Sequence, residues 1–252
     1  MRVSIFVEGL DEIRASQRLD YHIPNGYKSL EDLDIRCQEL VEEGRLFIVD
    51  SPEIRKAMLT MKFQEMPRSE FRDLGNFVFS KLVDKAVVVG GLRAIQYADG
   101  SWDNHNCKAG ISVRAGLSFM QSIEQHPMLK DIEIGFLTQT RDEENPDNIS
   151  NNPEKLGRFD NLIALLTDPM FAKGGSMLDF VNRVKELGAT SVITVTAFSA
   201  PQGIVRVADN TDAILVTTPL EGGLNKPAYI VGGLKQTAML GDAGDRRFGK
   251  LD

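Results

Sequence analysis

From about residue 109 onward, short apolar runs alternate with stretches in which apolar residues recur every three or four positions. The first pattern is typical of buried strands and the second of amphipathic helices. The expected strands are 111–113, 132–138, 162–166, 191–198 and 213–217, and the expected helices are 117–124, 176–187 and one that opens at Pro201. Strands that alternate with helices predict right-handed crossovers and a parallel sheet, so the fold class is α/β.

The helix expected at 176–187 has clear signals at both ends. Ser176 is a candidate N-cap, and Asp179 completes a Ser-x-x-Asp capping box. Gly188 suits a C-terminal stop. The apolar stripe of this helix consists of Met177, Phe180, Val181, Val184 and Leu187.

The first hundred residues have a weaker pattern. Helices are expected over 29–43, from Ser51-Pro52, where serine caps and proline occupies the first turn, and after Pro67. The last of these is predicted by apolar residues at helical spacing, namely Phe71, Leu74, Val78 and Leu82. The segment 85–97 is rich in valine and isoleucine and ends before Asp99-Gly100, so it is predicted to be β.

Composition excludes several classes of protein. The chain has 252 residues, which suits one α/β domain with additions or two small domains. Its formal net charge of −7 argues against a broad nucleic-acid-binding face, although a local basic pocket for a small polyanion stays open. Two separated cysteines and three scattered histidines form no disulfide framework and no metal pattern. We expect a reducing, cytoplasmic setting.

No apolar run approaches the length of a membrane span. The first eight residues are too short and too acidic for a signal peptide. We therefore expect neither a membrane anchor nor an export signal in this sequence.

One loop gives the most specific indication of a binding site. The apolar run 162–166 is followed by Asp168, then by Gly174-Gly175-Ser176 and the expected helix. Helix N-termini attract phosphate through exposed amides and the positive end of the helix dipole, and glycines let the backbone approach an anion. Asp168 suits ribose hydroxyls, so the segment predicts a sugar-phosphate site. Lys173 precedes the glycines, so this is no Walker motif, and a plain structural turn is the alternative.

Three further loops carry polar residues. Arg114-Ala115-Gly116 follows a strand and could hold a pyrophosphate, although a surface arginine is the commoner explanation. The long polar segment 139–157 is either a lid or an insertion. The segment 241–249 has two acids and two arginines, and it is either a solvated turn or a site for pyrophosphate and Mg²⁺.

Taken in order, these segments resemble the uracil phosphoribosyltransferase family. The matching motifs are Arg114-Ala115-Gly116-Leu117, Arg141-Asp142-Glu143-Glu144, 168–176, Ala200-Pro201-Gln202-Gly203, Gly223-Leu224-Asn225 with Tyr229-Ile230, and 241–246. The resemblance runs from about residue 55 to the C-terminus. We therefore expect a phosphoribosyltransferase domain over 55–252 and an N-terminal extension of unknown role over 1–54.

The resemblance implies a type I phosphoribosyltransferase fold, with a mostly parallel five-stranded sheet flanked by helices under a flexible hood. It implies a pyrimidine-salvage transferase that converts uracil and phosphoribosyl pyrophosphate (PRPP) into UMP and pyrophosphate with Mg²⁺. It also implies a cytoplasmic homodimer with small-molecule partners, and neither nucleic acid nor membrane. GTP, which activates some relatives, is a candidate activator.

The resemblance also assigns residues to roles. Arg114 and Asp242 are the expected catalytic residues, and Mg²⁺ is expected to bind through PRPP. The expected PRPP-binding residues are Arg114, Arg141, Asp168, Pro169, Met170, Phe171, Ala172, Lys173, Gly174, Gly175, Ser176 and Asp242. The expected uracil-binding residues are Ile230, Gly241, Asp242 and Ala243.

Three positions depart from the family pattern. Lys173 replaces a threonine, Thr140 replaces a tyrosine, and Gly232 replaces a proline. The stretch before Gly241 is also several residues longer than in the family, through 234–240. The alternatives to a uracil enzyme are therefore a phosphoribosyltransferase-fold protein with another base, or a non-catalytic nucleotide-binding or regulatory homologue.

Overall fold

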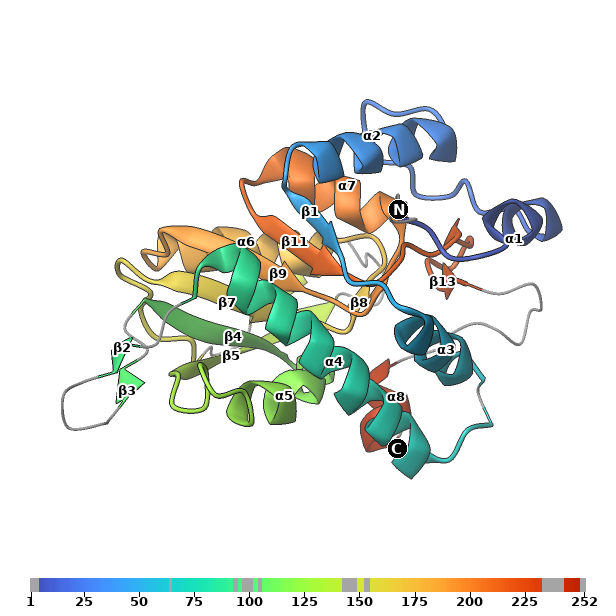
Figure 1. Ribbon diagram of the computed structural model, residues 1–252. Helices are drawn as coiled ribbons and strands as arrows, with labels where there is room; N and C mark the ends of the chain where they lie inside the picture. The colour runs from blue at the N-terminus through green and yellow to red at the C-terminus, as the bar shows by residue number, and fades with distance from the viewer. Residues whose placement is uncertain are drawn as a thin grey trace.

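The structure is a computed structural model that describes residues 5–63, 65–92, 95–96, 102–103, 106–141, 149–151, 155–232 and 243–249. At its centre is a seven-stranded sheet in the order β1-β11-β9-β7-β4-β5-β6 (Figure 1). The strands are β1 Leu46–Ile48, β4 Cys107–Val113, β5 Ile134–Arg141, β6 Ile149–Asn151, β7 Ile163–Thr167, β9 Ser191–Val195 and β11 Ile214–Thr217. The parallel α/β architecture predicted from the sequence is confirmed.

The sheet has two strands more than the five expected. Strand β1 joins the sheet in parallel with β11, and it comes from the segment treated above as an extension. Strand β6 pairs antiparallel with the end of β5, Gln139 opposite Asn151. The polar segment 139–157 is therefore in part a strand pair instead of a continuous loop, because β5 continues to Arg141 and meets a returning strand.

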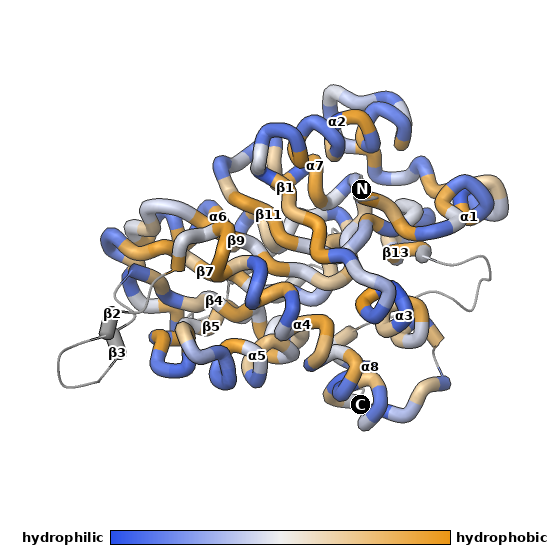
Figure 2. The backbone as a smooth tube through the Cα atoms, viewed as in Figure 1, coloured by the Kyte–Doolittle hydropathy of each residue, from blue (hydrophilic) through white to orange (hydrophobic). Residues whose placement is uncertain are grey.

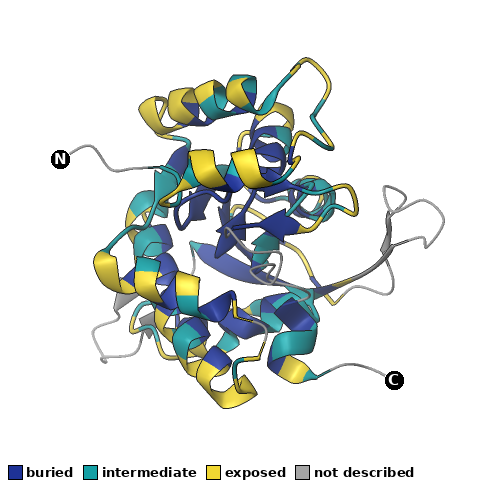
Figure 3. Cartoon of the chain, turned by 90° about the vertical axis from the view of Figure 1, so that its right-hand side faces the viewer, coloured by how far each residue is buried: buried dark blue, intermediate teal, exposed yellow. Residues whose placement is uncertain are grey.

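Helices cover both faces of the sheet. They are α1 Leu10–Ser16, α2 Leu30–Glu42, α3 Pro52–Met61, α4 Arg68–Gly90, α5 Met120–Glu124, α6 Gly175–Glu186, α7 Pro201–Asn210 and α8 Ala243–Phe248, with a 3₁₀ turn, η1, at Ala115–Phe119. Apolar colour concentrates on the strands and on the inner sides of the helices (Figure 2). The buried residues lie in the middle of the molecule, and the exposed ones follow the outer sides of the helices (Figure 3).

Side chains at alternate strand positions pack into two separate hydrophobic clusters. In β7, Leu165 joins the cluster formed with α3, α4 and α5, whereas Ala164 and Leu166 join the cluster formed with α2, α6 and α7. This division follows from the two-residue period of a strand, whose successive side chains point to opposite faces. The near-continuous apolar run of β7 is the pattern expected of a parallel strand buried on both faces.

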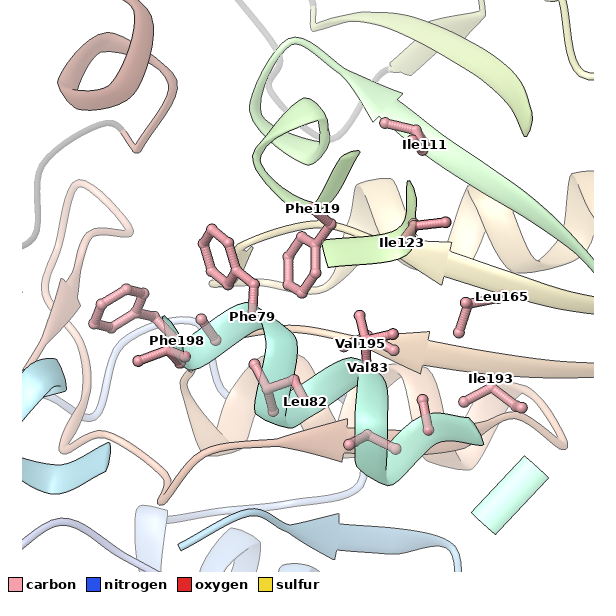
Figure 4. Packing of buried hydrophobic residues seen from close by; sticks show 14 of the residues in the cluster. Phe79, Leu82, Val83, Ile111, Phe119, Ile123, Leu165, Ile193, Val195 and Phe198 are labelled. Atoms are coloured by element: carbon pink, nitrogen blue, oxygen red, sulfur yellow. The ribbon is translucent and has the colours of Figure 1, made fainter. Parts of the chain in front are cut away.

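Helix α4 is longer than the sequence predicts. Its buried residues Phe71, Val78, Leu82 and Ala86 keep helical spacing as far as the last turns, and Gly91 ends the helix in the left-handed conformation with φ 58°. The β prediction for 85–97 is therefore wrong over 85–90, because packing of one helix face outweighs the β propensity of valine. Phe79 of α4 stacks on Phe119 with ring centroids 4.2 Å apart, in the core drawn in Figure 4.

The first fifty residues have a structural role. Helix α2 begins with a reciprocal capping box between Ser29 and Asp32, and it is joined to α7 by the ion pair of Arg36 with Asp209 at 3.0 Å. Ser51 caps α3, as predicted, by accepting a hydrogen bond from the amide of Ile54. The domain boundary at residue 54 stays a prediction.

Three two-stranded sheets complete the fold. They are β8 Met170–Phe171 with β10 Phe198–Ser199, β12 Gly223–Leu224 with β13 Ile230–Val231, and β2 Ile95–Gln96 with β3 Trp102–Asp103. The first two follow the carboxyl ends of β7, β9 and β11. Single bridges tie Phe6 to Leu220 and Asp20 to Leu224 at this end of the molecule, where α1 and β13 also lie (Figure 1).

Candidate functional site

The loops that follow β7, β9 and β11 are hydrogen-bonded to one another. The amide of Phe198 donates to the carbonyl oxygen of Pro169 at 2.9 Å, and the amide of Ala200 donates to Phe171 at 2.9 Å. The amide of Glu221 in turn donates to Ser199 at 2.9 Å. Ligands of parallel sheets bind beyond the carboxyl ends of the strands, so these bonds build one frame for a site.

Asp168 directly follows the last residue of β7, so the acid lies at the end of a strand as the sequence predicted. Its amide donates to the carbonyl oxygen of Val195 at 3.2 Å, and its Oδ1 accepts a hydrogen bond from the amide of Met170 at 3.1 Å. The side chain is only partly buried. The carboxylate is therefore fixed in direction and still accessible from the site.

Helix α6 begins inside the glycine loop. Gly174 is its N-cap, in the left-handed conformation with φ 76°, and its carbonyl oxygen accepts the first helical hydrogen bond from Leu178 at 2.9 Å. No side chain caps the helix, so the predicted Ser176 cap is wrong. The left-handed turn at Gly174 starts the helix earlier and places Ser176 within its first turn. The amides and the positive dipole end of that turn belong to the loop that begins at Asp168.

A close approach between two glycines holds this loop against α7. A Cβ on Gly174 would lie 2.6 Å from the carbonyl oxygen of Gly203, and a Cβ on Gly203 would lie 2.5 Å from that of Ala172. Both distances are too short for any side chain. The loop and the first turn of α7 can therefore pack this closely only when positions 174 and 203 are both glycine.

Arg114 follows β4 and contacts the C-terminal helix α8. Its Nη2 lies 2.5 Å from Oδ1 of Asp245, and its Nη1 donates to the carbonyl oxygen of Gly249 at 3.0 Å. Two residues after Arg114, a Cβ on Gly116 would lie 2.6 Å from the carbonyl oxygen of Thr167. The arginine loop thus packs on the end of β7, directly before Asp168. The structure brings together three of the sequence motifs at this point.

A buried ion pair that the sequence analysis missed lies next to Gly232. Nζ of Lys62 is 2.8 Å from both carboxylate oxygens of Glu221, and only the contact to Oε2 has hydrogen-bond geometry. Nζ also donates to the carbonyl oxygen of Gly232 at 3.0 Å. Burial away from water raises the pKa of the Glu221 carboxyl, and the adjacent ammonium opposes that rise. The two residues are 159 positions apart, so no local pattern announces the pair.

Comparison with known families decides the assignment of the fold. The family model for uracil phosphoribosyltransferase matches residues 48–250, which is most of the chain. The chain belongs to the uracil phosphoribosyltransferase family. The match starts at the last residue of β1 and ends beyond α8, so it includes every loop described above.

Two similar proteins can be compared with this chain. The uracil phosphoribosyltransferase of Bifidobacterium adolescentis is 36% identical over 149 residues, which cover 56% of this chain and 64% of that protein, less than two thirds of its length. The structure of the AQ2163 protein from Aquifex aeolicus has a TM-score of 0.67 and 22% identity over 81% of this chain and 98% of that one. The second likeness shows the shared fold.

Several of the uracil phosphoribosyltransferase motif residues fall outside what the structure describes. Gly241 and Asp242 are outside it, as are 142–148 and 233–240. For Arg141 the backbone is placed, at the end of β5 opposite Ile149. Of the residues expected at uracil, Ile230 and Ala243 are described, and both are buried.

Within the described part of the chain, no group of three or more His, Cys, Asp or Glu side chains lies close enough together to hold a metal ion. Cys37 and Cys107 are free and buried, and burial raises the pKa of the Cys107 thiol to about 11. None of the described helices is both long enough and apolar enough to span a membrane.

Proposed function

We propose that this protein transfers the phosphoribosyl group of PRPP to uracil and releases UMP and pyrophosphate. The observation that carries the proposal is the donor loop, 168–176, in a member of this family. In that loop a fixed, accessible carboxylate on Asp168 stands at the end of a strand, and the first turn of α6 follows a glycine bend at Gly174.

Each part of the donor has a group of matching chemistry. Asp168 would accept hydrogen bonds from the ribose hydroxyls, and the first turn of α6 with 172–176 would bind the 5′-phosphate. Pro169, Met170 and Phe171 form the strand and turn that carry this loop. We assign the pyrophosphate to Arg114 and Arg141, because arginine binds phosphate oxygens in bidentate pairs. Asp242 would lie between donor and base.

The reaction forms a bond from a ring nitrogen of uracil to the anomeric carbon and breaks the bond from that carbon to the pyrophosphate oxygen. The transition state has oxocarbenium character and a multiply charged leaving group. The protein therefore contributes positioning and charge stabilisation, and no side-chain nucleophile is needed. Arg114 contributes fixed positive charge at the leaving group.

The residues present fit a donor-borne magnesium ion. Mg²⁺ in proteins keeps several waters and binds one or two carboxylates together with substrate phosphates. Asp168 is an accessible carboxylate at the donor loop, which suits this mode. When bound, the ion neutralises charge on the leaving pyrophosphate.

We assign the base to Ile230, Gly241, Asp242 and Ala243. Ile230 and Ala243 are buried, at β13 and at the start of α8 respectively. We further propose a cytoplasmic homodimer and Mg²⁺ dependence, and we treat GTP as a candidate activator. These last proposals rest on the family resemblance.

An assay with a panel of bases tests the proposed function. The purified protein is incubated with PRPP, Mg²⁺ and uracil, cytosine, hypoxanthine, guanine or adenine, and nucleotide and pyrophosphate are measured. We expect UMP and pyrophosphate in equal amounts with uracil. A product formed with another base instead of uracil would change the proposed substrate. The absence of a product with every base would contradict the proposal that the protein is an enzyme.

A further inference from the structure

Among the ion pairs of the described residues, that of Lys62 and Glu221 is the most buried, and the proposed reaction leaves it unused. The two side chains are 5% and 1% exposed. Removing two charges from water costs about as much as their attraction returns, so a buried pair is weak evidence for stability. The contacts of the pair indicate what it holds in place.

The first element that the pair holds is β13. Nζ of Lys62 donates to the carbonyl oxygen of Gly232, the residue directly after β13, which contains Ile230. A Cβ on Gly232 would lie 1.9 Å from Oε2 of Glu221 and 2.7 Å from Nζ of Lys62. The pair therefore occupies the space that any side chain at 232 would need, including the ring of the proline in the family pattern. The glycine and the pair depend on each other.

The second element is α8, which the turn around Lys62 holds through its backbone. The guanidinium of Arg246 donates to the carbonyl oxygen of Met61, and also to that of Phe63 at 2.7 Å. Arg246 belongs to the same short helix as Ala243. Residues 61–63 at the end of α3 thus contact both β13 and α8, the two elements that supply the described residues of the base end.

The pair is also attached to the donor half of the site. The amide of Glu221 donates to Ser199 of β10, and β10 pairs with β8 of the donor loop. Glu221 therefore stands between the donor loop and Gly232, with its amide bonded to β10 and its carboxylate paired with Lys62. A change at Glu221 would therefore alter contacts to both halves of the site.

We infer that Lys62 and Glu221 are a positioning pair that sets β13 and α8 against the donor loop, and so determines how a pyrimidine base is bound. The inference rests on the proposed function for the identity of that base. Neither side chain needs to touch the base, because Lys62 acts through Gly232 and through the end of α3. The same pair makes glycine the only residue that fits at 232.

The test uses the double variant Lys62→Met/Glu221→Leu, which removes both charges and leaves neither buried alone. We expect KM for uracil to rise by about tenfold or more, with KM for PRPP within about threefold, because small misplacements of reacting groups cost large factors. Gly232→Ala should give the same split, and it serves as the second variant if the double variant does not fold. The control, Arg36→Met/Asp209→Leu, removes the pair between α2 and α7 and should leave both KM values unchanged.

Hydrogen exchange supplies a readout that needs no turnover. In the double variant, exchange should become faster at 230–232 and 243–248 and stay unchanged in α6. A folded double variant with uracil KM within about twofold of wild type, or with equal rises in both KM values, overturns the inference. If the wild-type protein makes no UMP, the proposed function fails by itself, and unchanged exchange at 230–232 then overturns the positioning role separately.

Discussion

Gly174 and Gly203 meet so closely that a Cβ on Gly174 would lie 2.6 Å from the carbonyl oxygen of Gly203. One glycine lies in the donor loop as the N-cap of α6, and the other lies in the first turn of α7. This contact fixes the position of the helix start that we assign to the 5′-phosphate.

Gly203→Ala should therefore disrupt the donor loop. The new Cβ would lie 2.5 Å from the carbonyl oxygen of Ala172 and 2.9 Å from that of Phe171, and backbone atoms cannot yield as a flexible side chain does. We expect a loss of about 1–3 kcal/mol in the free energy of unfolding and a rise of about tenfold or more in the Kd for PRPP. Chemical denaturation and calorimetric titration measure the two effects.

Gly44→Ala is the matched control for this variant. Gly44 has φ +69°, and a Cβ there would meet no atom within 4 Å. The left-handed conformation costs an alanine about 1–2 kcal/mol, but the donor loop is not touched. Comparable loss of PRPP binding in both variants would contradict the specific role of Gly203.

Lys173→Thr should keep or improve donor binding. Lys173 lies in the donor loop between Ala172 and Gly174, where the family pattern has a threonine hydroxyl. The first turn of α6 supplies amides for the phosphate without the lysine. Calorimetric titration with PRPP measures the change, and a loss of tenfold or more in affinity (about 1.4 kcal/mol) would show that Lys173 is itself a phosphate ligand.

Arg114→Gln should raise KM for PRPP by about tenfold to a hundredfold, because a charge-assisted bond to the leaving group is lost. The side chain is paired with Asp245 on α8, so the variant also removes that ion pair. The control is Arg18→Gln, which removes an exposed arginine paired with Asp20. Initial rates at varied PRPP concentration give KM for each variant. Equal KM values for PRPP in the two variants would refute the assignment of Arg114 to the pyrophosphate.

Stability should fall as the pH decreases through the range of His126. Burial lowers the pKa of its imidazole, with an opposing effect from Asp84, and its Nδ1 accepts a hydrogen bond from the amide of Met128 at 3.1 Å. Between that lowered pKa and the unfolded value of about 6.5, the unfolded chain binds more protons, so the free energy of unfolding increases with pH there.

Denaturation of wild type and His126→Asn at pH 5, 6 and 7 measures this term. We expect the variant to lose less stability than wild type as the pH decreases from 7 to 5. If the free energy of unfolding had the same pH dependence in both proteins, His126 would not be the source of the loss of stability at low pH.

The sequence predicted the sheet where periodicity and burial agree. The apolar runs of β7, β9 and β11 appear where expected, because strands buried on both faces need near-continuous apolar residues. The valine-rich end of α4 was wrongly predicted as β, because its helical face is defined by partners far away in the chain, such as Ile193, whose side chain packs closely against Gly90.

The donor loop was predicted because its residues are contiguous, whereas the start of α6 was not, because a left-handed Gly174 leaves no side-chain signature. The pair of Lys62 and Glu221 is visible only in three dimensions. It joins the end of α3 to the loop after β11, and no spacing rule connects those two segments.

The most direct test of the central claim is the formation of UMP from uracil and PRPP by wild type and by Asp168→Asn under the same conditions. Asp168 is the residue to which we assign the ribose hydroxyls, and its Oδ1 accepts a hydrogen bond from the amide of Met170. We predict that wild type makes UMP and pyrophosphate one for one, and that the variant loses about a hundredfold or more of kcat/KM. UMP formation that is unchanged in Asp168→Asn, or absent in wild type, would contradict the account.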